Sequence, residues 1–201
     1  MHGWLKGGIL ALLFWAQGAL AGSVLVVGDS ISAAFGLETS QGWVHLLQER
    51  LAEGDGARRV VNASISGDTT AGGLARLAPL LDEHRPDVVI LELGGNDGLR
   101  GQPPAQLKQN LASMVEKSQQ AGAKVLILGM RLPPNYGVRY TTAFAEVFSK
   151  VAEESGSALV PFVLEGIGGV PSMMQLDGIH PTADAQPVIL DNVWPALKPL
   201  L

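Results

Sequence analysis

Four short polar blocks contain the residue types that ester hydrolysis by a serine nucleophile requires. They are Gly28-Asp29-Ser30, Gly67 with its neighbours, Gly95-Asn96-Asp97, and Asp177-Gly178-Ile179-His180. A serine hydroxyl is a poor nucleophile at neutral pH, so it needs an imidazole base, a carboxylate that orients the base, and hydrogen-bond donors for the oxyanion. The chain has a candidate for each of these parts.

Ser30 is the candidate nucleophile because it follows an apolar segment at a turn, and Gly28 allows the backbone to approach closely. A serine after Gly-Asp is also typical of an ordinary turn or helix cap. Ser32, Ser64 and Ser66 therefore remain alternatives at this point.

His180 is the candidate base, and Asp177, three residues earlier, is its candidate carboxylate partner. His2 lies at the extreme N-terminus, whereas His45 and His84 lie within or beside helical stretches among charged residues. Gly178 and Pro181 are typical of a loop, which could bring the aspartate to one ring nitrogen while the other faces the serine. The alternative is a surface turn with a capping aspartate and a solvated histidine.

The backbone N–H groups of Ser30 and Gly67 and the side-chain amide of Asn96 are the candidate donors for the oxyanion. Gly67 has no side chain in the way, and asparagine offers an NH2 group. The alternative is that Ser66-Gly67-Asp68 and Gly95-Asn96-Asp97 are ordinary turns after strands.

The elements that must position these residues alternate between strand and helix. Short runs rich in valine, isoleucine and leucine predict buried strands, and longer stretches with apolar residues at helical spacing predict helices. The strands are expected at Ser23 to Val27, Arg59 to Asn62, Val88 to Leu93, Lys124 to Gly129 and Ala158 to Val160, and the helices at Trp43 to Ala52, Pro104 to Ala121, Thr141 to Glu154 and Ala183 to Lys198. This alternation predicts one α/β domain, residues 22–201, with a parallel sheet covered by helices.

Three polar blocks follow the first, second and third predicted strands, and the block that ends at His180 lies beyond the fifth. Ligands bind outside the carboxyl ends of strands in open parallel sheets. We therefore expect all four blocks to lie along the same edge of the sheet.

The order and spacing of the four blocks resemble those of the SGNH, or GDSL-type, hydrolase family over almost the whole chain beyond residue 21. The resemblance lies in Val27-Gly28-Asp29-Ser30, Ser66-Gly67-Asp68, Gly94-Gly95-Asn96-Asp97 and Asp177-Gly178-Ile179-His180-Pro181, with Ile31 where the family signature has leucine. It implies a flavodoxin-like three-layer α/β/α fold with a five-stranded parallel sheet. It also implies a triad of Ser30, Asp177 and His180, an oxyanion hole of Ser30, Gly67 and Asn96, and no metal or other cofactor. Gly67-Asp68-Thr69-Thr70 and the ending at Pro181 are most similar to the bacterial thioesterase, lysophospholipase and arylesterase branch.

The N-terminus predicts export. Lys6 precedes an apolar run from Ile9 to Trp15, and Ala19-Leu20-Ala21 forms a small-residue cleavage site, so residues 1–21 resemble a secretory signal peptide. The chain has no cysteine, which excludes disulfides and a lipid-anchoring cysteine. We expect a periplasmic or secreted monomer without a stable membrane anchor.

The charge balance argues against nucleic acid as a partner. Cleavage after Ala21 would leave 13 basic and 19 acidic residues, a net charge of −6. We expect instead a small-molecule or lipid acyl substrate.

Apolar residues near the polar blocks could form a groove for an acyl chain. The candidates are Ile31, Leu74, Leu77, Met173, Met174 and Ile179, although packing in the core explains any one of them equally well. Two other functions remain open: a carbohydrate O-acetylesterase with a more polar crevice, and a non-catalytic flavodoxin-like module that binds phosphate through Ser66, Thr69 and Thr70.

Overall fold

Five short strands form one sheet in which every neighbouring pair is parallel. They are β1 (Ser23–Gly28), β2 (Arg59–Asn62), β3 (Val88–Glu92), β4 (Lys124–Leu128) and β5 (Ala158–Val160), in the order β2-β1-β3-β4-β5. The computed structural model describes residues 22–54 and 58–201, and the expected signal peptide lies outside them. All five predicted strands are confirmed to within one residue at each end. The apolar side chains of β1, β3 and β4 are buried between two helical layers, whereas those of the edge strands β2 and β5 are mostly half-buried.

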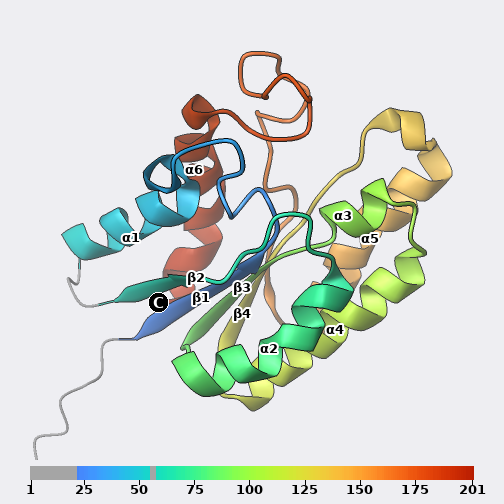
Figure 1. The fold of residues 1–201 in the computed structure, drawn as a ribbon. Coiled ribbons are helices and arrows are strands. Elements are labelled where there is room, and N and C mark those ends of the chain that lie inside the picture. The colour runs from blue at the N-terminus through green and yellow to red at the C-terminus, as the bar shows by residue number, and fades with distance from the viewer. Residues whose placement is uncertain (1–21, 55–57) are drawn as a thin grey trace, which may run out of the picture.

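Helices cover both faces of the sheet (Figure 1). α1 (Trp43–Glu53) and α6 (Gln186–Leu197) lie on one face, and α2 (Thr70–His84), α4 (Pro104–Gln120) and α5 (Val138–Ser155) lie on the other. The expected flavodoxin-like three-layer α/β/α fold is therefore confirmed, with the strand order typical of that fold.

Two helices lie where the sequence analysis placed none. α2 begins after Thr69, whose hydroxyl accepts a hydrogen bond from the Gly72 N–H, and its residues Leu77 and Leu81 face the core. α3 (Gly95–Leu99) is a helix of five residues in the Gly95-Asn96-Asp97 block, where a turn was the alternative. Its sequence, GNDGL, has low helix propensity, so tertiary contacts must stabilise it.

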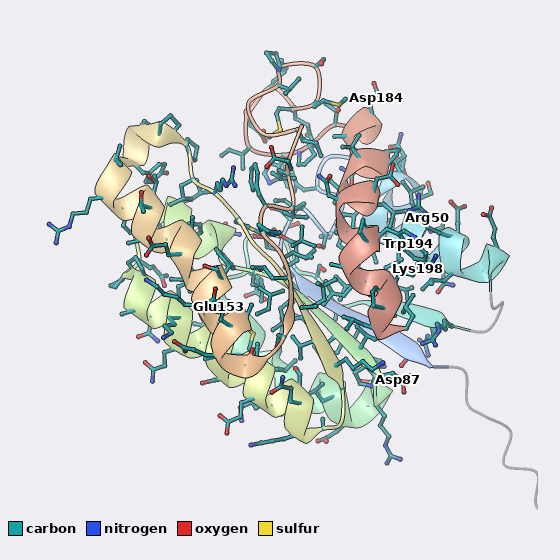
Figure 2. The ribbon with its side chains drawn as sticks, turned by 180° about the vertical axis from the view of Figure 1, so that it is seen from behind. Arg50, Asp87, Glu153, Asp184, Trp194 and Lys198 are labelled. Atoms are coloured by element: carbon teal, nitrogen blue, oxygen red, sulfur yellow. The ribbon has the colours of Figure 1, made fainter. Side chains whose placement is uncertain are left out.

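The last predicted helix begins later than expected. Ala183–Ala185 form a 3-10 turn, and α6 follows with Pro187 in its first turn, where the missing N–H of proline costs nothing. Figure 2 shows Trp194 of α6 beside Arg50 of α1, whose guanidinium carbon lies 5.3 Å from the centre of an indole ring. Arg50 also pairs with Asp191 of α6 at 2.9 Å, so charge and packing both join these helices on one face.

Candidate active site

Ser30, His180 and Asp177 form one hydrogen-bonded chain, although 150 residues of sequence separate the serine from the histidine. The Nε2 atom of His180 lies 2.9 Å from the Ser30 hydroxyl oxygen, and its Nδ1 atom lies 2.6 Å from Oδ2 of Asp177. Because a carboxylate only accepts, Nδ1 carries the proton and Nε2 is free to accept from the serine. This is the arrangement that a serine nucleophile and its base require.

The loop after β5 holds the Asp177 carboxylate in a fixed orientation. Its Oδ1 atom accepts hydrogen bonds from the backbone N–H groups of Ile179 at 2.9 Å and His180 at 3.0 Å. The hydrogen bond with the His180 side chain is the main reason that the pKa of Asp177 falls to about 2, and these backbone bonds add to it. Asp177 is therefore a carboxylate at neutral pH.

Asp29 links the nucleophile turn after β1 to the third polar block. Its Oδ1 atom accepts from the Ile31 N–H at 3.0 Å, and its Oδ2 atom accepts from the Asn96 side-chain amide at 3.1 Å. Burial raises the pKa of Asp29 to about 6, against the lowering effect of these two hydrogen bonds. The hydrogen bond from Asn96 to Asp29 uses one N–H of the side-chain NH2 group. The other N–H of that group points away from Asp29.

Gly67 and Asn96 are each held by contacts between the polar blocks. Gly67 has a φ of +80°, which a residue with a side chain rarely adopts, and its carbonyl oxygen accepts from the Arg100 guanidinium at 2.9 Å. Asp97, next to Asn96, accepts from the backbone N–H and the hydroxyl of Thr70 at 2.9 and 2.5 Å.

The N–H groups of Ser30 and Gly67 donate to no other residue in the part of the chain that the structure describes. These groups therefore keep their donors available for a ligand.

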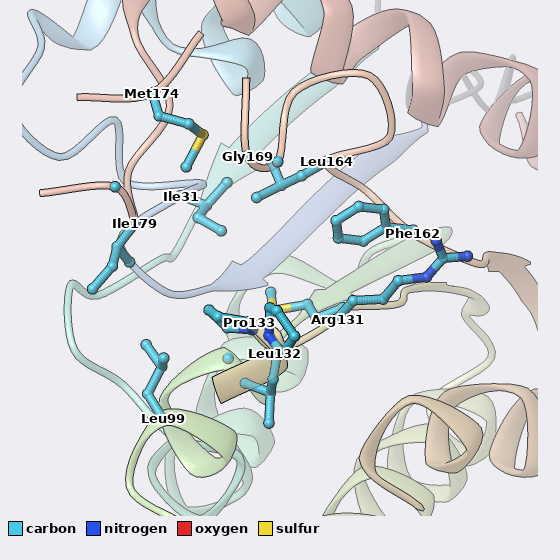
Figure 3. A pocket seen from close by; sticks show the side chains of 15 residues that line it. Ile31, Leu99, Arg131, Leu132, Pro133, Phe162, Leu164, Gly169, Met174 and Ile179 are labelled. Atoms are coloured by element: carbon cyan, nitrogen blue, oxygen red, sulfur yellow. The ribbon is translucent and has the colours of Figure 1, made fainter. Parts of the chain in front are cut away.

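An apolar cavity of about 360 Å³ (Figure 3) is lined by Ile31 and Ile179, the chain neighbours of Ser30 and His180. Its walls come from the nucleophile turn, α3, the segments after β4 and β5, and the loop before His180. They include Ile31, Leu99, Leu132, Phe162, Leu164, Met174 and Ile179. Among the residues that the structure describes, Arg131 is the one charged residue of the lining, and its guanidinium carbon lies 4.9 Å from the centre of the Phe162 ring. A cavity of this size and polarity suits an apolar chain.

The structure brings three of the six expected groove residues to this cavity. Ile31, Met174 and Ile179 line it. The expectation for Leu77 is wrong, because α2 directs this side chain into the core, where it is wholly buried. Leu74 and Met173 are half-buried against the core and do not line the cavity.

The sequence analysis missed the residues that follow β4 and β5. Met130, Arg131, Leu132 and Pro133 come directly after β4, and Phe162 and Leu164 come after β5. The rule that placed the polar blocks at the carboxyl ends of strands applies equally to these segments. Apolar residues in a loop suggest no chemistry by themselves, so their sequence gives no sign that they line a cavity.

Within residues 22–54 and 58–201, no group of three or more histidine, cysteine, aspartate or glutamate side chains is arranged to hold a metal ion. No helix in this part of the chain is both long and apolar enough to span a membrane.

Comparisons with known proteins agree with the geometry. The model of the GDSL-like lipase/acylhydrolase family matches residues 26–186. Esterase TesA of Pseudomonas aeruginosa is 64% identical over 201 residues, which cover all of both chains. Thioesterase 1/protease 1/lysophospholipase L1 of Escherichia coli K12 is 44% identical over 96% of this chain and 91% of its own.

A crystal structure of TesA superposes with a TM-score of 0.87 at 67% identity, covering 89% of this chain and 99% of the other. The family resemblance and the branch expected from the sequence are both confirmed. The chain belongs to the GDSL-like lipase/acylhydrolase family, and it is an esterase of that family.

Proposed function

We propose that the protein is an exported serine esterase that hydrolyses acyl esters and thioesters, including aryl esters, acyl-CoA and lysophospholipids. Ser30 is the nucleophile, His180 the general base and Asp177 its partner. Ser30, Gly67 and Asn96 supply the oxyanion hole. The observation that carries the proposal is that the Asp177, His180 and Ser30 hydrogen-bond chain adjoins an apolar cavity.

The reaction begins when Ser30 attacks the acyl carbon and its hydroxyl proton passes to Nε2 of His180, 2.9 Å away. The new C–O bond leaves negative charge on the former carbonyl oxygen, which the three donors stabilise. Asp177 stabilises the imidazolium through Nδ1, at 2.6 Å, without taking its proton.

The tetrahedral intermediate collapses when the bond from the acyl carbon to the alcohol or thiol breaks. His180 gives its proton to that leaving group, and an acyl group remains on Ser30. Water then attacks the acyl-enzyme with His180 again as base, which releases the carboxylic acid and restores the serine.

The apolar surroundings of the triad favour an acyl chain over a polar substrate. Exposed apolar side chains lie near the site: the centre of the Phe35 ring lies 4.4 Å from the centre of the His180 ring, and Ile179 lines the cavity. A substrate with an apolar chain would remove this surface from water, which is favourable.

The proposal of export rests on the sequence of residues 1–21. Cleavage of this segment would leave a periplasmic or secreted monomer that consists of the hydrolase domain, residues 22–201. Mass spectrometry of the protein recovered from the periplasm of an expressing bacterium tests this. The proposal requires a chain that begins at Gly22, and an unprocessed chain that begins at Met1 would contradict it.

The second candidate is a carbohydrate O-acetylesterase with the same triad. It needs a crevice with several polar groups for sugar hydroxyls, whereas Arg131 is the only charged side chain in the cavity lining within residues 22–54 and 58–201. The cavity therefore favours the first candidate. The third candidate, a phosphate-binding module, gives no role to the hydrogen bonds of His180 with Ser30 and Asp177.

A hydrolysis profile on p-nitrophenyl esters from acetate to palmitate tests the proposal, with Ser30→Ala as the control. We expect activity that depends on Ser30 and extends to medium or long chains. Activity on acetate alone would favour the O-acetylesterase, and activity that survives Ser30→Ala would exclude this nucleophile.

A further inference from the structure

Glu92 is an acidic residue that the proposed reaction does not use, and it lies directly against the nucleophile turn. It is the last residue of β3 and is wholly buried. One of its oxygens, Oε2, accepts hydrogen bonds from the Asp29 N–H at 3.2 Å, the Ser32 N–H at 3.2 Å and the Ser32 hydroxyl at 2.6 Å. A single carboxyl oxygen thus contacts the residues on both sides of Ser30 in the chain.

The backbone around this carboxyl is shaped to admit it. Gly28 of β1 pairs with Glu92 in the parallel register, and a Cβ atom on Gly28 would lie 2.7 Å from Oε2 of Glu92. Any other residue at position 28 would collide with the carboxyl. The Ser32 carbonyl oxygen in turn accepts from the Asn62 side chain of β2 at 2.8 Å, so the turn is held from both neighbouring strands.

No positive charge that the structure describes pairs with Glu92. The nearest acidic neighbour is Asp29, whose negative charge opposes a second one beside it. Arg76 of α2 directs its guanidinium to Asp68 and to the carbonyl oxygens of Ala63 and Gly28, and His180 pairs with Asp177. β4, on the other side of β3, presents Ile127 and Leu128.

The second carboxyl oxygen, Oε1, is buried, and no residue that the structure describes forms a hydrogen bond with it. A buried ionised carboxyl without a counter-charge is far more costly than a neutral one. Burial, with the Asp29 charge beside it, accordingly raises the pKa of Glu92 well above its usual range. A neutral carboxyl group avoids the cost of a buried charge: its carbonyl oxygen remains the acceptor at Oε2, and its hydroxyl lies at Oε1.

We propose that Glu92 is a positioning residue that acts as a neutral acid. Its carbonyl oxygen fixes both flanks of the turn and so holds the Ser30 hydroxyl at hydrogen-bond distance from His180. The inference rests on the proposed role of Ser30. In it, Glu92 of the central strand β3 holds the nucleophile turn in place.

Two substitutions separate this role from that of an ionised carboxylate. Glu92→Gln keeps an oxygen acceptor at the Oε2 position and places NH2 at the position without a partner. Glu92→Leu has a similar volume and leaves the three donors unpaired. We expect Glu92→Gln to keep kcat within about threefold of wild type, since one neutral acceptor replaces another.

In Glu92→Leu, displacement of the serine should lower kcat by about 100-fold with little change in KM, since misplacement by about 1 Å has that cost. Wild type and Glu92→Gln should react with a serine-directed phosphonate at similar rates, and Glu92→Leu should react much more slowly. A Glu92→Gln enzyme as impaired as Glu92→Leu would overturn the neutral-acid role, and wild-type kcat in Glu92→Leu would overturn the positioning role.

Infrared spectroscopy tests the protonation state even if Glu92→Leu fails to fold. Wild-type protein at pH 8 should show the C=O stretching band of a protonated carboxyl, and Glu92→Gln should lack it. Absence of that band in the wild type means an ionised Glu92 and overturns the proposal. Activity that persists in Ser30→Ala would instead refute the proposed nucleophile, and the band would be unaffected.

Discussion

Asp29→Asn offers a quantitative test of how the raised pKa of Asp29, the residue before Ser30, affects the stability of the protein. The pKa of Asp29 is about 6 in the folded protein, against 3.8 for an unperturbed group, and burial is the main cause. Folding therefore favours the protonated form. The stability that Asp29 contributes is fully present below pH 3.8 and is lost as the pH rises through about 6.

The size of this loss follows from the difference between the two pKa values. At about 1.36 kcal/mol for each pKa unit, it is about 3 kcal/mol. Asparagine cannot ionise, so the variant should not suffer it. The free energy of unfolding of Asp29→Asn minus that of wild type should therefore rise by about 3 kcal/mol across this pH range. Any constant effect of the substitution on packing cancels from this change.

Urea unfolding of both proteins at several pH values between 3.5 and 8 would measure the effect. Asp177→Asn is the matched control, because the pKa of Asp177 lies at about 2 and its stabilising effect is lost only as the pH falls through that value. Its difference from wild type should be nearly constant above pH 4. Parallel stability curves for wild type and Asp29→Asn would refute the reasoning.

Three further predictions concern catalysis. Asn96→Ala should lower kcat by about 100- to 1,000-fold with little change in KM, because an oxyanion donor acts in the transition state, and a raised KM at unchanged kcat would count against this role. Asp177→Asn should lower kcat by up to about 10⁴-fold, because the amide favours the wrong tautomer of His180, and steady-state kinetics showing a loss below tenfold would contradict it. Leu164→Trp should fill part of the cavity and lower the ratio of kcat/KM for octanoate to that for acetate, whereas Val138→Trp, at an exposed site outside the cavity, should leave the ratio unchanged.

The sheet could be predicted from the sequence because parallel strands between helices are apolar on both faces. Val88 to Leu91, for example, are wholly buried. Such a short, continuous run of valine, isoleucine and leucine is typical of a strand that is buried on both faces. The polar blocks could be located because each candidate comes at a strand end or in the loop near His180. Chain order alone then placed them at one edge.

Contacts between distant segments could not be predicted in the same way. α3 forms in GNDGL, a sequence of low helix propensity, where Asp97 accepts hydrogen bonds from Thr70 at the start of α2. Glu92 lies in an apolar strand, and nothing in its neighbours along the chain shows that it contacts Asp29 and Ser32. The cavity likewise combines Leu132 and Phe162 with Ile31, which only the folded sheet brings together.

Mass spectrometry of the protein after reaction with a serine-directed phosphonate tests the central claim most directly. We predict one adduct per chain, located on Ser30, and loss of ester hydrolysis in proportion to labelling. We also predict no adduct in Ser30→Ala and much slower labelling in His180→Asn. An adduct on Ser32, Ser64 or Ser66, or hydrolysis that continues in fully labelled protein, would contradict it.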